Sequence, residues 1–444
     1  MKTALVTSIA ATLALLAVPA WAGTFTVAPL TGDADSGIAA GKAYTHAIDM
    51  GDGPNRTVNG AVFTGSGGGA NPATNDYFTT GITDLLPGWA NPNVSGATGG
   101  LFTNFNFQSA GGTETVTLNN LRVGQQYVTT FYNSLWGGPR SQNITTSDGG
   151  AITFDPDATP GSLLQYSFTA TATSQTYTFV PNQPASFHQA AFTNEVVGYT
   201  ALLTDNFYAP GNPNTGDLNF NLAARQGGTL GPITYSQVGN TQVGNPTGGV
   251  DSGNYLLTAF GGRVSPDFNF NNTYSSGGLS VSFDLAPNIN GGNPGDWGSV
   301  NIGASAGGAT AFVNDGTPHL GILFRGNGLI EVWDGAANVT SAPAWGPGGV
   351  TNALNHFELL ITDPTDFNPF DGAGQTDVEV YANGILVYNF SKGGGGYADN
   401  YVNFGASAIA GHDNLVIAQV PEPGSFALLA LGGLALLRRR RPVC

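Results

Sequence analysis

Residues 377–390 read DVEVYANGILVYNF, and this stretch decides the fold class. Valine, tyrosine, isoleucine and phenylalanine dominate the two runs on either side of Ala382-Asn383-Gly384. β-Branched and aromatic residues favour strands, and Asn-Gly between two such runs is a strong signal for a tight hairpin turn. The stretch therefore predicts an antiparallel β-hairpin.

Strand patterns continue on both sides of this hairpin. Apolar and polar residues alternate at 278–285, and an Arg-Gly-Asn-Gly turn joins two further runs at 320–324 and 329–333. The remaining segments are DNF at 205–207, HFELLIT at 356–362, YVNF at 401–404 and HDNLVI at 412–417. In this order they resemble concanavalin A-like jelly rolls of the laminin-G and lectin/glucanase kind. The resemblance implies a two-sheet sandwich at residues 199–418 whose first and last strands are neighbours.

Residues 23–198 carry shorter strand patterns, separated by clusters of Gly, Asn and Pro. The clearest feature is LNNLRVGQQY at 118–127, which resembles the corner of galactose-binding-like and fibronectin-like sandwich domains. We expect Leu118 and Leu121 to close the open end of a core, and Gly124 to permit the chain reversal. Residues 65–100 are rich in Gly, Asn and Pro and are expected to be loops.

No segment shows a convincing 3.6-residue apolar period, so few helices are expected. The sequence thus predicts an all-β protein with two β-sandwich (jelly-roll-like) domains, at residues 23–198 and 199–418. A signal peptide at residues 1–22 precedes them, and a tail at residues 419–444 with a short hydrophobic anchor helix follows them.

The signal peptide has the expected three parts. Lys2 precedes an apolar run at residues 4–18, and Ala20 and Ala22 form an A-x-A cleavage site. We expect cleavage between Ala22 and Gly23, which implies export.

The tail also has three parts in a fixed order. Pro421, Glu422 and Pro423 come first, and an apolar run at residues 424–437 follows. The tail then carries four arginines, Arg438, Arg439, Arg440 and Arg441. The run is shorter than the about 20 residues that span a bilayer, and the arginines favour a cytoplasmic C-terminus.

This order of elements resembles the PEP-CTERM sorting signal of bacteria. The resemblance implies contact with the membrane through the tail, processing by an exosortase, and delivery to the cell envelope, cell surface or extracellular matrix. An ordinary tail anchor is the alternative.

The composition excludes several classes of function. Charged residues make up only 9% of the chain, and the mature body carries eight basic against 28 acidic residues once Lys2, Glu422 and the four tail arginines are set aside. Its net charge of about −20 argues against nucleic acid as a partner, because such binding relies on Lys and Arg at phosphates. The single cysteine, Cys444, excludes an internal disulfide.

Catalytic patterns are missing from the sequence. Glucanases that share the jelly roll resemble one another in an E-x-D-x-x-E pattern, which sets the carboxyls on one face of a strand. Here Asp377 and Glu379 share a face without a third partner, and Glu358 stands alone, so solvent-facing positions are expected. The five histidines have no metal-ligand spacing and are expected at the surface or in loops.

Two kinds of binding site remain as candidates. Asp363, Asp366, Asp371 and Asp377 crowd oxygen donors into a short loop, which suits Ca²⁺, although Asp and Asn also favour plain turns. A looser cluster at Asp33, Asp35, Asp49 and Asp52 is a second calcium candidate. Trp136 and Trp297 lie beside glycines in segments that are expected to be loops, and both are candidate platforms for stacking on sugars.

The sequence therefore predicts an exported, exosortase-sorted surface or matrix protein that is not an enzyme, with polysaccharide as its expected ligand. One alternative is a glycan-active hydrolase or lyase on the jelly roll, and another is a purely structural matrix protein.

Overall fold

The computed structural model describes residues 22–421 of the chain. The described range has gaps at 52–54, 66–75, 83, 87, 89–92, 110, 139, 183, 208–215, 245–254, 259–260, 268, 270–276, 292, 305–319, 335–336, 343–344, 346–352, 366–367, 371–373 and 394–400. Most of the signal peptide and the expected anchor helix at 424–437 lie outside it. Within the described residues, no helix combines the length and the apolar character needed to cross a membrane.

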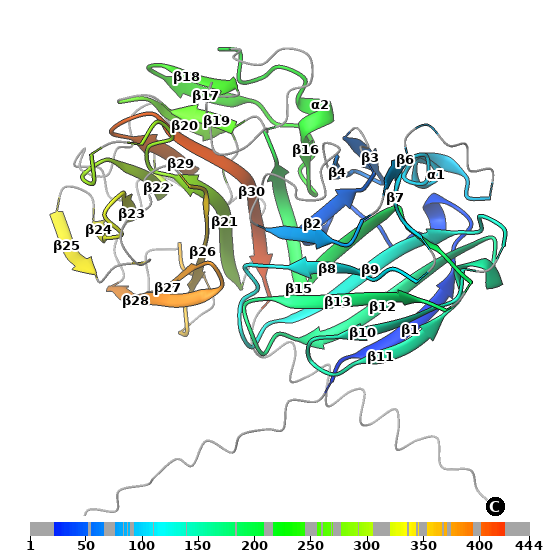
Figure 1. Ribbon diagram of the computed structural model, residues 1–444. Coiled ribbons are helices and arrows are strands. Elements are labelled where there is room, and N and C mark those ends of the chain that lie inside the picture. Colours follow the sequence, from blue (N-terminus) through cyan, green and yellow to red (C-terminus); the bar gives the residue numbers. More distant parts are fainter. Residues whose placement is uncertain are drawn as a thin grey trace, which may run out of the picture.

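The all-β prediction is confirmed. Described helices are short: α1 (Gly96–Gly100), α2 (Leu222–Arg225) and two 3-10 turns, η1 (Asp33–Asp35) and η2 (Pro156–Ala158). Among the described residues, the strands form sheets of 15, five, three and seven strands, and all but one of their pairs are antiparallel. Two sandwiches result, one at each side of Figure 1.

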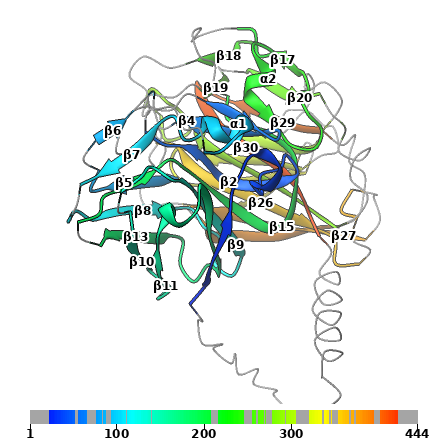
Figure 2. The same ribbon diagram turned by 90° about the vertical axis from the view of Figure 1, so that its right-hand side faces the viewer.

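The first sandwich is built from the first half of the chain. Its strands are β1 (Thr24–Pro29), β2 (Lys42–Asp49), β3 (Arg56–Val58), β4 (Ala61–Gly65), β5 (Tyr77–Thr80), β6 (Asp84–Leu86), β7 (Phe105–Gln108), β8 (Glu114–Leu118), β9 (Gln126–Ser134), β10 (Gln142–Thr146), β11 (Ala151–Phe154), β12 (Gly161–Thr169), β13 (Gln175–Pro181), β14 (Phe187–Gln189) and β15 (Ala191–Asp205). The layer β1-β12-β9-β15 packs on the five-stranded sheet β11-β10-β13-β8-β5, which lies to one side in Figure 2. Phe131, Tyr177 and Phe179 fill the core between them.

The second sandwich follows. Its strands are β16 (Gln226–Gly227), β17 (Tyr235–Val238), β18 (Thr241–Gly244), β19 (Tyr255–Thr258), β20 (Arg263–Pro266), β21 (Gly278–Ala286), β22 (Trp297–Ala304), β23 (Leu320–Arg325), β24 (Ile330–Asp334), β25 (Ala337–Ala342), β26 (Asn355–Thr362), β27 (Gln375–Ala382), β28 (Ile385–Gly393), β29 (Tyr401–Ala406) and β30 (Ala410–Val420). The layer β30-β21-β26-β27-β28 packs on the seven-stranded sheet β17-β20-β29-β22-β23-β24-β25. Phe283, Phe324, Phe357 and Phe404 meet in its core.

One strand belongs to both sandwiches. The first part of β15 pairs with β9 and β2, and its last part pairs with β30, so a single 15-stranded sheet runs through the molecule. The expected domain boundary at residue 198 falls inside this strand, at Gly198, where φ is 87° and the register with β2 shifts. The pairing Leu203↔Ile417 makes the first and last strands of the second sandwich neighbours, as the jelly-roll resemblance implied.

The local turn predictions are confirmed. β27 and β28 form the hairpin at 377–390, and Asn383 and Gly384 have φ angles of 50° and 78°, the left-handed pair that its turn requires. In the corner, Leu118 and Leu121 are buried, and Gly124 has a φ of 88°. The expectation of loops at residues 65–100 is wrong in part, because β5, β6 and α1 lie there.

Candidate functional site

Polar side chains from distant parts of the chain converge where the two sandwiches meet. Asp76 immediately precedes β5, Asn120 lies in the corner after β8, Asp284 lies on β21 and His356 on β26. Asn414 lies on β30 at a bulge, where the register with β21 shifts and φ is 48°. This bulge lets the Asn414 side chain reach both carboxylates.

A network of hydrogen bonds holds these groups together. The Asn414 amide donates to Asp76 Oδ2 at 2.9 Å and to Asp284 Oδ2 at 2.7 Å. His356 Nδ1 lies 2.8 Å from Asp284 Oδ1, and the Asn120 amide donates to Asp76 Oδ1 at 2.9 Å. The network therefore joins the first sandwich to the second through the Asp76 carboxylate. We call Asp76, Asp284, His356 and Asn414 the junction cluster.

Protons balance the charge of the junction cluster. Burial, together with the neighbouring Asp284 carboxylate, raises the pKa of Asp76 to about 8. Burial opposes the imidazolium of His356, but the hydrogen bond and the charge of Asp284 raise its pKa to about 9. Near neutral pH, a protonated Asp76 beside a His356–Asp284 ion pair leaves the cluster without net charge.

The same side chains could hold a metal ion. The ligand atoms of Asp76, Asp284 and His356 lie within 4.8 Å of one another. Two carboxylates and one imidazole are donors that suit divalent zinc or manganese. Such an ion would displace the hydrogen bond between His356 and Asp284.

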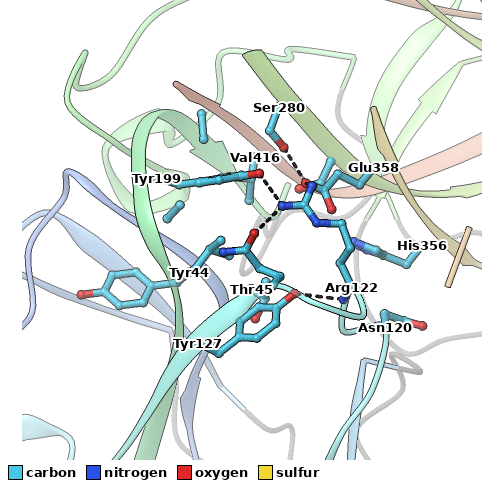
Figure 3. A pocket seen from close by; sticks show the side chains of 15 residues that line it. Tyr44, Thr45, Asn120, Arg122, Tyr127, Tyr199, Ser280, His356, Glu358 and Val416 are labelled. Carbon is cyan, nitrogen blue, oxygen red and sulfur yellow. Dashed lines mark hydrogen bonds and ion pairs between the residues drawn. The ribbon is translucent and has the colours of Figure 1, made fainter. Parts of the chain in front are cut away.

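Arg122 forms a second bridge between the sandwiches (Figure 3). Its Nη1 donates to Glu358 Oε1 at 3.0 Å, and Ser280 Oγ donates to the same oxygen at 3.0 Å. Its Nη2 donates to Gln125 and to the Tyr199 hydroxyl. The expectation that Glu358 faces solvent is wrong, because 85% of its side chain is covered and it is paired with Arg122.

The pocket around Arg122 is small. Its cavity of about 30 Å³ has room for about two water molecules, whereas ligand pockets run to about 300–1,000 Å³. Arg122 is bound to Tyr199 and Glu358, and His356 is bound to Asp284, so these side chains already have partners. As arranged, this pocket fastens the two sandwiches and does not admit a sugar ring.

The outer face of the five-stranded sheet presents rows of hydroxyl groups. Thr145 pairs with Thr178, Thr178 with Thr115, and Thr115 with Thr80, so one row crosses four strands. Thr176 and Thr117 start a second row, which ends at the exposed ring of Phe78. Thr117 itself is buried, and its hydroxyl is hydrogen-bonded to that of Thr176 at 2.9 Å. We call these six threonines, Thr80, Thr115, Thr117, Thr145, Thr176 and Thr178, the threonine face.

The predicted calcium loop is described only in part. Asp363 is buried and accepts hydrogen bonds from the backbone N–H groups of Thr365 and Gln375, as in a turn. Asp377 accepts from Ser391 Oγ at 2.6 Å. Asp366 and Asp371 lie outside the described residues, so calcium in this loop stays a prediction.

The residues of the looser acidic cluster have separate structural roles. Asp33 accepts hydrogen bonds from Thr98 and Ala97 at the start of α1, and Asp35 accepts from Thr31 and Gly32. Asp49 is paired with Arg56 at 2.7 Å. Asp52 lies outside the described residues.

The two candidate tryptophans lie in different settings. Trp136 follows β9 and packs half-buried against Phe105 and His188, with ring centroids 4.6 and 5.1 Å away. Trp297, expected in a loop, is the first residue of β22 and is half-buried. Sugar stacking by either ring stays a prediction.

The structure describes only the residues of the two processing signals that adjoin the folded body. Ala22 is exposed and Gly23 leads into β1, whereas Ala20 lies outside the described residues. Pro421 ends the described chain; the remaining sorting-signal residues, Glu422, Pro423 and Arg438 to Arg441, lie beyond it.

Sequence reasoning missed the junction cluster. His46 and His412, expected at the surface, are buried, and His356 belongs to the cluster. Asp76 lies in a segment read as loop, and it is 338 residues from Asn414 in the chain. No spacing rule connects such positions; the only local signal was the alternation that turns Asp284 of VSFDL toward the sheet face it shares with His356.

Comparison with known proteins supports the sorting signal. Residues 419–441 match the PEP-CTERM protein-sorting motif, which implies an exported chain that an exosortase sorts to the cell surface. No curated protein sequence matches the chain significantly.

Solved structures give distant likenesses only. The receptor-binding domain of botulinum neurotoxin mosaic serotype C/D is 14% identical, with a TM-score of 0.32, over 52% of this chain and 50% of that one. The chain thus spans about half the length of that domain. The endo-β-1,4-glucuronan lyase from the fungus Trichoderma reesei is 10% identical, with a TM-score of 0.28, over 49% of this chain and 94% of its own. The ANX2 ectodomain from Arabidopsis thaliana is 9% identical, with a TM-score of 0.26, over 85% of this chain and 97% of its own. What the comparisons establish is the PEP-CTERM sorting motif at residues 419–441.

Proposed function

We propose that this chain is a non-catalytic, polysaccharide-binding protein of the cell surface or extracellular matrix, delivered through its sorting tail. The observation that carries the proposal is the threonine face beside the exposed ring of Phe78. A hydroxyl both donates and accepts hydrogen bonds, and adjacent strands repeat it at about 4.8 Å. A row of such groups beside an aromatic ring suits a neutral chain of sugars.

Two further features support binding without cleavage. In the small pocket at the junction, Arg122 is bound to Tyr199 and Glu358, and His356 is bound to Asp284. The charge of about −20 also favours neutral over acidic polymers, which like charges would repel.

The test uses the chain from Gly23 to Cys444 in mild detergent, mixed with a panel of neutral and acidic polysaccharides. Each tube is run with calcium and with chelator, and is assayed for new reducing or unsaturated ends. We expect retention on one or more neutral polymers and no new ends. New ends would overturn the non-catalytic role, and loss of retention with chelator would favour a calcium-dependent site at the Asp363 loop.

A matched pair of variants locates the surface. Thr178→Arg places a long charged side chain in the middle of the threonine face, and we expect at least about tenfold weaker retention because the hydroxyl row is covered. Thr169→Arg is the control, because Thr169 is an exposed strand threonine of the same sandwich on β12, in the other sheet. Equal retention by both variants would exclude the threonine face. Retention of neither the native chain nor the variants on any polymer would leave a purely structural matrix protein as the function.

A further inference from the structure

The first residue of the expected mature chain lies in a site shaped for it. Gly23 N donates to Asp148 Oδ2 at 3.3 Å, across 125 residues of sequence. A Cβ on Gly23 would lie 2.5 Å from Ser167 O, 2.6 Å from Tyr166 Cζ and 2.8 Å from Phe168 Cβ. Only glycine fits there without displacing the backbone of β12.

Hydrogen bonds hold the Asp148 carboxylate in its ionised form, facing Gly23. It lies in the turn between β10 and β11, where Tyr166 Oη and Thr146 Oγ1 each donate to its Oδ1 at 2.6 Å, and Gln175 donates at 3.1 Å. Its Oδ2 is the oxygen that faces Gly23. Burial opposes its charge, but these hydrogen bonds lower the pKa of Asp148, so it stays ionised across the neutral range.

In the precursor, Gly23 offers this carboxylate a neutral amide. Cleavage of the Ala22–Gly23 peptide bond by water converts that amide into an α-amino group, which is protonated below about pH 7.7–8.0 in an unfolded chain. We propose that cleavage before Gly23 creates an α-ammonium group that binds Asp148 and pins β1 onto the first sandwich. The inference rests on the expected cleavage position and is independent of polysaccharide binding.

Pinning matters because β1 is an edge strand. It forms one end of the 15-stranded sheet and pairs only with β12 among the described strands, from Thr24↔Ser167 to Pro29↔Ser162. Edge strands fray and can pair with other chains. An ion pair at its first residue holds the strand only after the signal peptide is gone, so β1 reaches its full stability after export.

The pH range of the pairing follows from the groups that face Gly23. Asp148 comes from the β10–β11 turn, Tyr166 from β12 and, behind it, Tyr177 from β13. Burial raises the pKa of Tyr166 to about 12, so only Asp148 is charged near neutral pH. A raised α-amino pKa in the folded chain stabilises it below about pH 7.7, and this stability is lost as the pH rises through the folded value.

The test measures the reactivity of the α-amino group in the exported full chain. N-terminal sequencing first establishes the start, and an N-hydroxysuccinimide ester at pH 7.5 then acylates the amine, followed by mass spectrometry. We expect Asp148→Asn to raise the rate about tenfold, the effect of about one pKa unit. Asp155→Asn is the matched control, because Asp155 is exposed at the other end of β11 and asparagine keeps its cap at η2. Equal rates in Asp148→Asn and the native chain, or a first residue other than Gly23, would overturn the proposal.

A second variant avoids any effect of Asp148 on folding. A chain that starts at Ala22 keeps the amide at Gly23. We expect its α-amine to react about tenfold faster than the α-amine of the chain that starts at Gly23, and its rate to be unchanged by Asp148→Asn. Hydrogen exchange in residues 24–29 should be about fivefold faster in this chain than in the chain that starts at Gly23. Unchanged exchange would show that the ammonium does not pin β1, and would also overturn the proposal.

Discussion

Two arginines with covered side chains differ in what they connect. Arg225 and Asp205 are 20 residues apart, have no exposed side-chain surface, and lie within the second sandwich at 3.1 Å. Arg122 and Glu358 are 236 residues apart and join the two sandwiches, with 9% and 15% of their side chains exposed.

The difference separates folding from assembly. Asp205 also accepts hydrogen bonds from the Tyr235 hydroxyl at 2.9 Å and from the backbone of Phe207 at 2.8 Å, so it organises the start of one sandwich. Arg122 instead binds groups from both sandwiches, including Gln125 and Tyr199 of the first and Glu358 of the second. Damage to the first pair should unfold a sandwich, whereas damage to the second should loosen the junction.

The largest expected effect comes from Asp205→Asn. The substitution leaves the buried Arg225 guanidinium without a counter-charge, and we expect a loss of about 3–5 kcal/mol in the free energy of unfolding, measured in urea. The double variant Asp205→Leu with Arg225→Met removes both charges and should recover most of that loss. A loss below about 1 kcal/mol in the single variant would mean that water reaches Arg225.

A glycine pair tests the packing of the junction. Gly384 lies at the β27–β28 turn with a φ of 78°, and a Cβ there would lie 2.1 Å from the backbone oxygen of Leu121 in the first sandwich. Gly124 has a similar φ of 88°, but its added Cβ meets no atom within 4 Å. We expect Gly384→Ala to cost about 3 kcal/mol and Gly124→Ala about 1 kcal/mol, because only the former also overpacks. Equal losses in the urea transition would show that the turn and the corner are not in contact in solution.

Substitution of Arg122 tests how much the Arg122–Glu358 ion pair contributes to the free energy of unfolding. Arg122→Met should cost about 1–2 kcal/mol, because it leaves Glu358 largely covered with only Ser280 as a donor. Arg325→Met is the control: Arg325 pairs with Glu331 at 2.7 Å on a hairpin within the second sandwich, and 13% of the Glu331 side chain is exposed, close to the 15% of Glu358. We therefore expect a similar loss in the free energy of unfolding there, without an effect on the junction. Proteolysis near the junction should rise in Arg122→Met alone, and a rise in both variants would contradict the assignment.

Features that depend on residues close together in the sequence could be predicted, and features that depend on distant residues could not. The Asn383-Gly384 turn, the Leu118–Gly124 corner and the alternating strands depend on neighbours in the chain, and each is present. The tail motif is also local and is confirmed by the match at residues 419–441.

The junction depends on pairs that the sequence does not bring together. Asp76 follows a Gly-rich segment whose composition favours loops, and its partner Asn414 gains its position from a bulge in β30. The sequence predicts Glu358 as a solvent-facing strand residue, but in the structure the first sandwich covers it. The same limit applies to β15, which changes its pairing partners along its length. Gly198 lies at this change, but the chain has 66 glycines, so the sequence does not single it out.

The smallest expected effect is a pH dependence of the junction cluster. Asp76 and His356 have folded pKa values of about 8 and 9, above their ordinary values, so both stabilise the fold at low pH and lose this contribution as the pH rises. Asp76 loses its contribution between about pH 4 and pH 8, whereas asparagine cannot ionise. We therefore expect Asp76→Asn to be more stable than the native chain already at pH 6, and this gain to grow by at least about 1 kcal/mol up to pH 9, measured by urea unfolding. Glu114→Gln is the contrast, because burial inside the first sandwich also raises the pKa of Glu114 and adds a slope unrelated to the junction. If the slope from pH 6 to 9 is unchanged in Asp76→Asn and vanishes in Glu114→Gln, the pH sensitivity belongs to a single sandwich, and the junction carries no proton of its own.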